Sequence, residues 1–347
     1  MRSNTSDVER LVRRSLLRLL TGEREIRLTR AVPSPEALRE KFGEIDIYAD
    51  IVGGKPVTSL YIGGGTPTTM LHSGLTDIIG HVRRTFDLQC DVHMESHPNH
   101  LSAENLDAIE ALGVRHLSLG VESLVDRHLR TLCRPYTVSQ VKEAVGRALT
   151  HGFTCVNVDV MFALPGQTCR EVADTGRELV RLGVDQVAAY PLFLFPYTSM
   201  GRTRGTGAHV IRQSLTRRRM LRILEAIFYE GGYERTSIWA FTKRGVPRYC
   251  SVTVPLYLGL GASGGSYFRD VFYLNTFGVA EYIKALDDGG LAIALSVDLT
   301  EKMQRTGWLY WRVYETRFRK ADYRDRSGED IDAAYGRYLT ARAGSVS

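Results

Sequence analysis

The chain has 347 residues, of which 44% are hydrophobic and 24% charged, with a formal net charge of +6 and a pI near 9.0. That hydrophobic content can build the core of one large domain or of two ordinary ones. Because the longest apolar runs are much shorter than the roughly 20 residues that span a bilayer, we expect a cytoplasmic protein without a transmembrane helix.

The positive charge is concentrated in arginine clusters, which raises the question of an acidic partner. They lie at Arg10–Arg18, Arg212–Arg222 and Arg312–Arg326. No nucleic-acid motif accompanies them, and arginine-rich helix faces are usually solvated surface. We therefore expect neither nucleic acid nor membrane as a partner, and the oligomeric state stays open.

The secondary structure expected in chain order begins with a helix at residues 1–24, where leucines recur at helical spacing among arginines. Residues 25–212 then alternate short β-branched runs with helical stretches, a pattern typical of βα units in a parallel sheet. A break rich in glycine, threonine and arginine follows at 198–209, and residues 213–347 are expected to form a small α+β C-terminal domain. The expected strands are 25–29, 58–62, 92–95, 116–119, 155–162 and 186–190, and the expected helices between them are 35–48, 69–84, 103–112, 138–150 and 170–182.

Glycine-rich or polar segments follow four of these strands. They are Gly63–Pro67, Glu95–Pro98, Gly120–Ser123 and Leu164–Thr168. The functional sites of α/β barrels lie at the carboxyl ends of the strands, so these segments should converge on one site.

The order and spacing of these and further segments resembles the oxygen-independent coproporphyrinogen III oxidase-like family of radical-SAM enzymes. The resemblance extends from about Arg27 to Arg319. It implies a partial (β/α)6 radical-SAM-type barrel that binds S-adenosylmethionine. The segments that carry it are Tyr61–Thr68, Glu95–Asn99, Ser118–Ser123, Leu132–Thr137, Asn157–Thr168, Tyr190–Leu192 and Tyr257–Ala262.

The resemblance also implies roles for individual residues. The glycine-rich turn would receive the ammonium of the cofactor through backbone carbonyls, and the planar fork of Arg134 suits its carboxylate. Glu95 and Asp159 match family carboxylates that bond the cofactor, Asp159 at the ribose. The expected cofactor-binding residues are Gly63, Gly64, Gly65, Thr66, Pro67, Glu95, Glu122, Arg134, Asp159 and Met161.

Three departures from the family pattern shape the functional hypothesis. The family carries a Cys-x-x-x-Cys-x-x-Cys loop that holds a four-iron four-sulfur cluster, whereas Leu28–Pro35 contains no cysteine. Glu122 stands where the family usually has glutamine, and the haem-associated His-Asn motif is absent at Arg248–Pro255, which weakens a haem-chaperone role. The five cysteines are scattered at Cys90, Cys133, Cys155, Cys169 and Cys250.

From these departures we expect S-adenosylmethionine as cofactor and no four-iron four-sulfur cluster. The leading hypothesis is an enzyme that uses the sulfonium by non-radical chemistry, transferring a methyl or other carbon fragment to a small-molecule acceptor. Glu122, Asp159 and Tyr190 are the candidate catalytic residues. Two alternatives stay open: a non-catalytic accessory or binding protein derived from this fold, and a radical-SAM oxidoreductase or methyltransferase with an unrecognised cluster.

Residues 90–100 raise a separate question, because they contain a thiol, three imidazoles and two carboxylates, which are ligands that zinc uses. A strand through Val92–Glu95 would alternate the directions of these side chains. We therefore expect incidental histidines and no metal site.

Overall fold

The computed structural model describes residues 26–29, 43–49, 52, 54–193, 207–248, 253, 256–268 and 270–336, with the backbone alone for 26–29 and 207–213. The helix predicted at residues 1–24, the segment 30–35 and Cys250 lie outside these residues.

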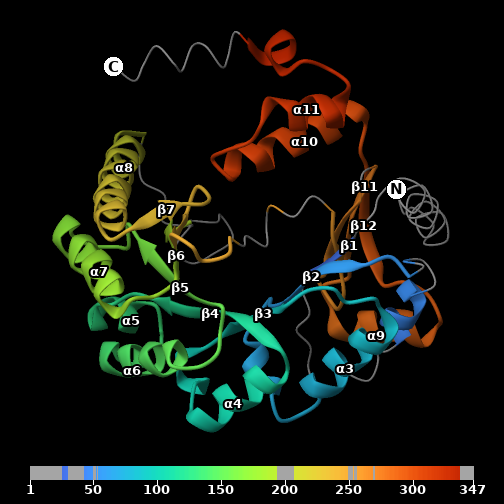
Figure 1. Ribbon diagram of the computed structural model, residues 1–347, viewed down its shortest axis with the longest axis horizontal. Helices are drawn as coiled ribbons and strands as arrows, with labels where there is room; N and C mark the ends of the chain where they lie inside the picture. The colour runs from blue at the N-terminus through green and yellow to red at the C-terminus, as the bar shows by residue number, and fades with distance from the viewer. Residues whose placement is uncertain are drawn as a thin grey trace.

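A curved sheet of nine strands, in the order β7-β8-β6-β5-β4-β3-β2-β1-β9, forms the centre of the fold. Six of these strands pair in parallel and in chain order, which confirms the predicted α/β partial barrel. Figure 1 shows the strands as an open arc. The six parallel strands are β1 (Ile26–Thr29), β2 (Val57–Ile62), β3 (Val92–Ser96), β4 (Val114–Glu122), β5 (Cys155–Phe162) and β6 (Gln186–Pro191).

Helices connect the parallel strands and cover the outer face of the arc (Figure 1). Two of them start at a threonine cap, where Thr137 with Gln140 and Thr168 with Glu171 satisfy the first backbone N–H groups reciprocally. The connecting elements are η1 (Pro67–Met70), α3 (Leu75–Thr85), η2 (Pro98–His100), α4 (Ala103–Ala111), α5 (Asp126–Thr131), α6 (Val138–Leu149) and α7 (Cys169–Leu182).

The C-terminal part of the chain extends this sheet and also builds a second one. Strand β8 (Ala240–Lys243) pairs antiparallel with β6, β7 (Tyr233–Arg235) pairs antiparallel with β8, and β9 (Leu258–Gly259) pairs in parallel with β1. The domain limits 25–212 and 213–347 stay predictions. The other C-terminal elements are α8 (Gly207–Glu230), β10 (Gly265–Phe268), β11 (Val271–Asn275), α9 (Val279–Asp287), β12 (Ile293–Asp298), α10 (Glu301–Tyr314) and α11 (Lys320–Ser327).

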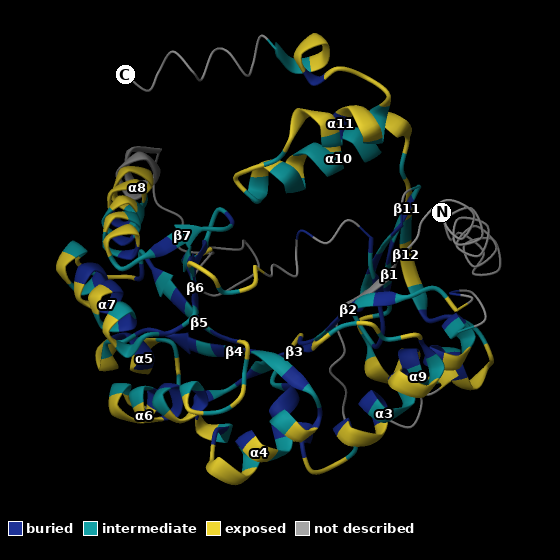
Figure 2. Cartoon of the chain, viewed as in Figure 1, coloured by how far each residue is buried: buried dark blue, intermediate teal, exposed yellow. Residues whose placement is uncertain are grey.

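Side chains alternate in direction along each strand, so one set faces the covering helices and the other faces the interior of the arc. In β5, Val156, Val158 and Val160 are buried, whereas Asn157, Asp159 and Met161 alternate with them and are less buried. Figure 2 shows the dark blue strands beneath helices whose outer faces are yellow. Polar side chains on the inner side of the arc are therefore available to a site.

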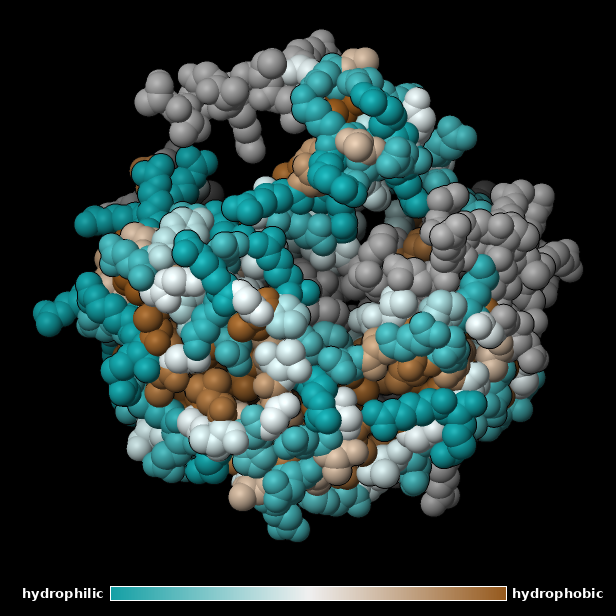
Figure 3. Space-filling view, in the orientation of Figure 1, coloured by the Kyte–Doolittle hydropathy of each residue, from teal (hydrophilic) through white to brown (hydrophobic). Residues whose placement is uncertain are grey.

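Helices α10 and α11 lie across the open side of the arc (Figure 1). None of the residues of α10 is buried, although the helix carries Trp308, Tyr310, Trp311 and Tyr314. On the face seen in Figure 3, hydrophilic side chains cover much of the outer helices and hydrophobic ones come into view between them. No helix among the described residues is both long enough and apolar enough to cross a bilayer.

Candidate functional site

The glycine-rich turn after β2 is held in place by Glu95 from β3. The Glu95 carboxylate accepts a hydrogen bond from the Gly64 backbone N–H at 3.0 Å and another from the Tyr61 hydroxyl at 2.7 Å. A Cβ on Gly63 would lie 2.6 Å from the Tyr61 ring and 2.7 Å from the Glu95 carboxyl, so a larger residue would displace these two side chains. Glu95 thus supports the turn from within the protein.

Glu122 and Arg134 meet at the carboxyl end of β4. Arg134 Nη2 donates to Glu122 Oε1 at 2.5 Å, and the Tyr190 hydroxyl from β6 donates to Glu122 Oε2 at 3.2 Å. Glu122 has a φ of 67°, in the left-handed region that is strained for a residue with a Cβ. The Tyr136 hydroxyl donates to the carbonyl oxygens of Gly120 and Val121 beside it and so holds this end of the strand.

Burial raises the pKa of Glu122, while the positive charge of Arg134 and the hydrogen bond from Tyr190 act in the opposite direction. Arg134 Nε is buried without a hydrogen-bond partner among the described residues. Because Glu122 takes one nitrogen of the guanidinium, the remaining donors of Arg134 can still bind a carboxylate. Glu122 therefore fixes the position of the Arg134 guanidinium without using all of its donors.

Asp159 lies on the interior face of β5 and joins this cluster to a deeper pocket. Its carboxylate accepts hydrogen bonds from Asn157 Nδ2 at 2.7 Å and from Ser118 Oγ at 3.2 Å. Burial, together with the negative charges of Glu122 and Glu95, raises the pKa of Asp159 to about 7. A carboxyl group that titrates near neutrality is a candidate proton donor, acceptor or ligand group.

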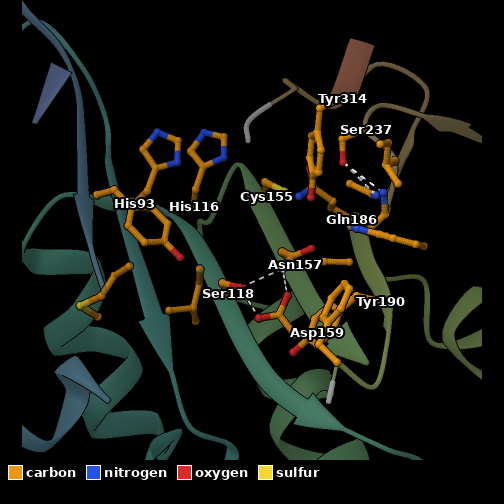
Figure 4. A pocket seen from close by; sticks show the side chains of 18 of the residues that line it. His93, His116, Ser118, Cys155, Asn157, Asp159, Gln186, Tyr190, Ser237 and Tyr314 are labelled. Atoms are coloured by element: carbon orange, nitrogen blue, oxygen red, sulfur yellow. Dashed lines mark hydrogen bonds between the residues drawn. The ribbon is translucent and has the colours of Figure 1, made fainter. Parts of the chain in front are cut away.

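An interior pocket of about 590 Å³ opens beside Asp159 and Tyr190 (Figure 4). Its volume lies within the range of about 300–1,000 Å³ that is usual for small-molecule sites. Strand residues form its floor, and Tyr310 and Tyr314 from α10 complete its wall. Aromatic side chains therefore surround a floor of polar groups. The other aromatic residues of the lining are Tyr61, His93, His116, Tyr190, Phe193 and Trp239.

The predicted site residues are distributed over this edge as follows. Glu122, Arg134 and Tyr190 contact one another, Asp159 lies beside them, and Glu95 contacts the glycine-rich turn. Thr66 caps η1 and Pro67 fills its first turn. Gly65 follows Gly64 in the same turn, and Met161 is the register partner of Tyr190 in the sheet. Their roles toward a cofactor stay predictions.

Sequence reasoning missed the pocket floor, namely His93, His116, Ser118 and Asn157. The histidines at residues 90–100 separate in the structure, since His93 lies in this floor and His97 packs edge-on against Tyr136. Side chains two residues apart on a strand face the same side. His93 lies two residues before Glu95, and Asn157 lies two residues before Asp159, so this alternation could have predicted these two floor residues from the sequence.

Comparison with known proteins adds sequence and structural relatives. Residues 33–179 match the Radical SAM superfamily. The heme chaperone HemW of Lactococcus lactis is 27% identical over 255 residues, which cover 72% of this chain and 65% of that protein. The oxygen-independent coproporphyrinogen III oxidase of Cereibacter sphaeroides is 25% identical, with coverage of 67% and 55%. The predicted resemblance to the oxygen-independent coproporphyrinogen III oxidase-like family of radical-SAM proteins is confirmed.

Solved structures support the same fold. The coproporphyrinogen III oxidase of Escherichia coli, described as a radical SAM enzyme, aligns with a TM-score of 0.79, covering 96% of this chain and 85% of that one. Its sequence identity is 18%, so this likeness bears on the fold alone. The matches to the two curated family members above span about two thirds or less of their lengths.

These findings correct the sequence-based function. We predicted non-radical transfer of a methyl or other carbon fragment without a cluster, and that prediction is wrong. The relatives are heme chaperones and a coproporphyrinogen oxidase of the radical-SAM family, which indicate radical chemistry or heme binding. The expectation that no four-iron four-sulfur cluster is present is contradicted by the same family membership, because such a cluster with S-adenosylmethionine is the cofactor set of the family.

The thiolate ligands for that cluster are not found in the part of the chain that the structure describes. No cysteine precedes Cys90 in the sequence, and Cys90, Cys133, Cys155 and Cys169 lie on separate elements. Among the described residues, no group of three or more cysteine, histidine, aspartate or glutamate side chains is placed to hold a metal ion. These residues do not fit the cluster, and we derive no chemical step through it.

Proposed function

We propose that this family member binds S-adenosylmethionine at the carboxyl edge of its sheet and a tetrapyrrole, such as heme, in the adjoining interior pocket. One observation carries the proposal: Asp159 and Tyr190 belong both to the charged edge cluster and to the wall of the pocket. Two ligands that share these residues would lie in contact.

The charges of the edge support the choice of S-adenosylmethionine. Its carboxylate would bind the free donors of Arg134, and its ammonium would bind the backbone carbonyls of the turn at Gly63–Gly65. The carboxylates of Glu122 and Asp159 provide negative potential for its sulfonium and hydrogen-bond acceptors for its ribose. The set thus contains a partner for the carboxylate, the ammonium, the sulfonium and the ribose of the cofactor.

The pocket walls support the choice of a tetrapyrrole. A large planar macrocycle gains most from flat aromatic surfaces, and tyrosine and tryptophan bury much area at little cost in side-chain entropy. Trp239, Phe193 and Tyr314 supply such surfaces around a volume of about 590 Å³. The names of the relatives, a heme chaperone and a coproporphyrinogen oxidase, point to the same ligand class.

Two variants with opposite expected effects test this proposal. Trp239→Leu removes a pocket wall and should weaken the binding of protoporphyrin IX, measured by fluorescence, while leaving S-adenosylmethionine affinity, measured by calorimetry, nearly unchanged. Arg134→Ala should do the reverse. Tyr229→Ala, which alters an exposed tyrosine of α8, is the matched aromatic control. Wild-type protein that binds neither compound would refute the proposal.

The same preparation addresses the chemistry that accompanies binding. Four irons and four sulfides per chain after anaerobic reconstitution would show that the protein holds a cluster, although the described residues provide no fitting set of ligands. Porphyrin binding without turnover would favour a carrier or accessory role. The cytoplasmic location remains part of this proposal, as does a small molecule, here the tetrapyrrole, as the binding partner.

A further inference from the structure

Two histidines lie side by side in the floor of the interior pocket. His93 of β3 and His116 of β4 are register partners in the parallel sheet, so both project toward the interior from neighbouring strands. Their rings are stacked with centroids 4.1 Å apart and planes inclined by 27° (Figure 4). His93 is buried, and His116 is less so. His116 is therefore the ring more open to a ligand.

Both imidazoles line the pocket, and imidazole is a common metal ligand. Cys155, the register partner of His116 on β5, is a poorer candidate because burial raises the pKa of its thiol to about 12.

A free metal ion and a metal bound within a macrocycle need different numbers of ligands from the protein. The described residues contain no set of three metal-binding side chains, so this floor does not suit a free ion. A tetrapyrrole brings its own equatorial nitrogens, and its metal needs only one or two axial ligands from the protein. One histidine at the floor and aromatic walls meet that requirement.

We propose that His116, stacked on His93, is the axial ligand to the metal of a metallated tetrapyrrole in the interior pocket. The inference rests on the proposed function and adds that the preferred ligand is heme-like, rather than a metal-free porphyrin or porphyrinogen. His93 is a positioning residue that fixes the ring of His116.

Parallel titrations with ferric heme and metal-free protoporphyrin IX test the metal preference, because the two differ only in the iron. The wild-type chain should bind heme more tightly and shift its Soret band to that of an imidazole-ligated iron. His116→Phe, which keeps an aromatic ring of similar shape, should remove the shift and the preference for heme while still binding protoporphyrin IX. His93→Phe should weaken heme binding by about tenfold, as expected when the support of a metal ligand is lost.

Two further samples sharpen the result. His116→Gly should lose the ligated spectrum and regain it when free imidazole is added, which a merely structural role would not produce. His72→Ala, a change of an exposed histidine after η1, should behave as wild type. An unchanged heme spectrum in His116→Phe, or equal losses for both porphyrins, would overturn this proposal alone. Failure of the wild-type chain to bind either porphyrin would overturn the proposed tetrapyrrole function with it.

Discussion

Two groups of buried carboxylates in this protein differ in how their oxygens are used. Glu44, in the helical residues 43–49, has no exposed surface. Its oxygens accept hydrogen bonds from the Gly261 N–H at 2.7 Å, the Asn275 amide at 2.8 Å and the Tyr282 hydroxyl at 2.6 Å. All three donors come from the C-terminal part of the chain, so this carboxylate joins distant segments.

Glu122 and Asp159 are arranged differently. Each accepts two hydrogen bonds and burial raises the pKa of both; Asp159 lines the pocket, and Glu122 contacts Tyr190 of the pocket lining. Burial alone therefore does not identify a functional carboxylate. The difference is that donors from the chain surround Glu44, whereas the edge carboxylates adjoin space for a ligand and can gain a proton or a ligand contact.

The largest effect should follow removal of the structural carboxylate. Glu44→Ala leaves three buried donors without their acceptor and should lower the free energy of unfolding by about 3 kcal/mol or more, since each such donor costs about 1–3 kcal/mol. Urea denaturation followed by circular dichroism measures this. Glu44→Gln, which keeps one acceptor, should lose less. A loss below about 1 kcal/mol would remove the distinction between the two groups.

Arg134→Ala should weaken S-adenosylmethionine binding by about 1.5–3 kcal/mol, because a charge-assisted hydrogen bond to the cofactor carboxylate is lost. Calorimetry gives the affinity. The matched control is Arg127→Ala, which breaks an exposed pair with Glu171 on the outer helices. If both arginine variants bind the cofactor equally well, Arg134 does not bind the carboxylate.

Asp159 should make stability depend on pH. Its folded pKa of about 7 lies above the ordinary value of 3.8, so the folded protein holds a proton that the unfolded chain has released. The free energy of unfolding should therefore fall as pH rises from about 4 to 7 and level off above, by at most about 1.4 kcal/mol per pH unit for one proton. Denaturation of wild type and Asp159→Asn at several pH values should show that the variant lacks this slope.

Glu122→Gln should produce the smallest change. A neutral amide holds Arg134 less firmly than a carboxylate, so cofactor affinity should fall by about 1 kcal/mol or less. Calorimetry beside Glu171→Gln, the exposed counterpart, separates this effect from a general change of charge. A loss as large as that of Arg134→Ala would instead show that Glu122 contributes as much to cofactor binding as Arg134 does.

Periodicity predicted the regular elements well. The expected strand at 155–162 coincides with β5, and the expected helix at 170–182 differs from α7 by one residue. Short-range interactions determine such helices and strands, because the alternation of apolar residues and the threonine caps act over a few positions. The predicted function was wrong, because the missing cysteine loop was taken to exclude the chemistry of the family.

The sequence by itself determined the βα units, the glycine-rich turn at Gly63 and the collinear motifs that identify the family. Tertiary structure alone decided that His93 and His116 stack, that Tyr314 reaches the pocket and that Glu44 bonds Gly261, which is 217 positions away. The physical reason is distance along the chain. Backbone preferences and caps are set by neighbours, whereas a pocket forms where side chains from remote strands and helices exclude water together, and no local pattern records their meeting.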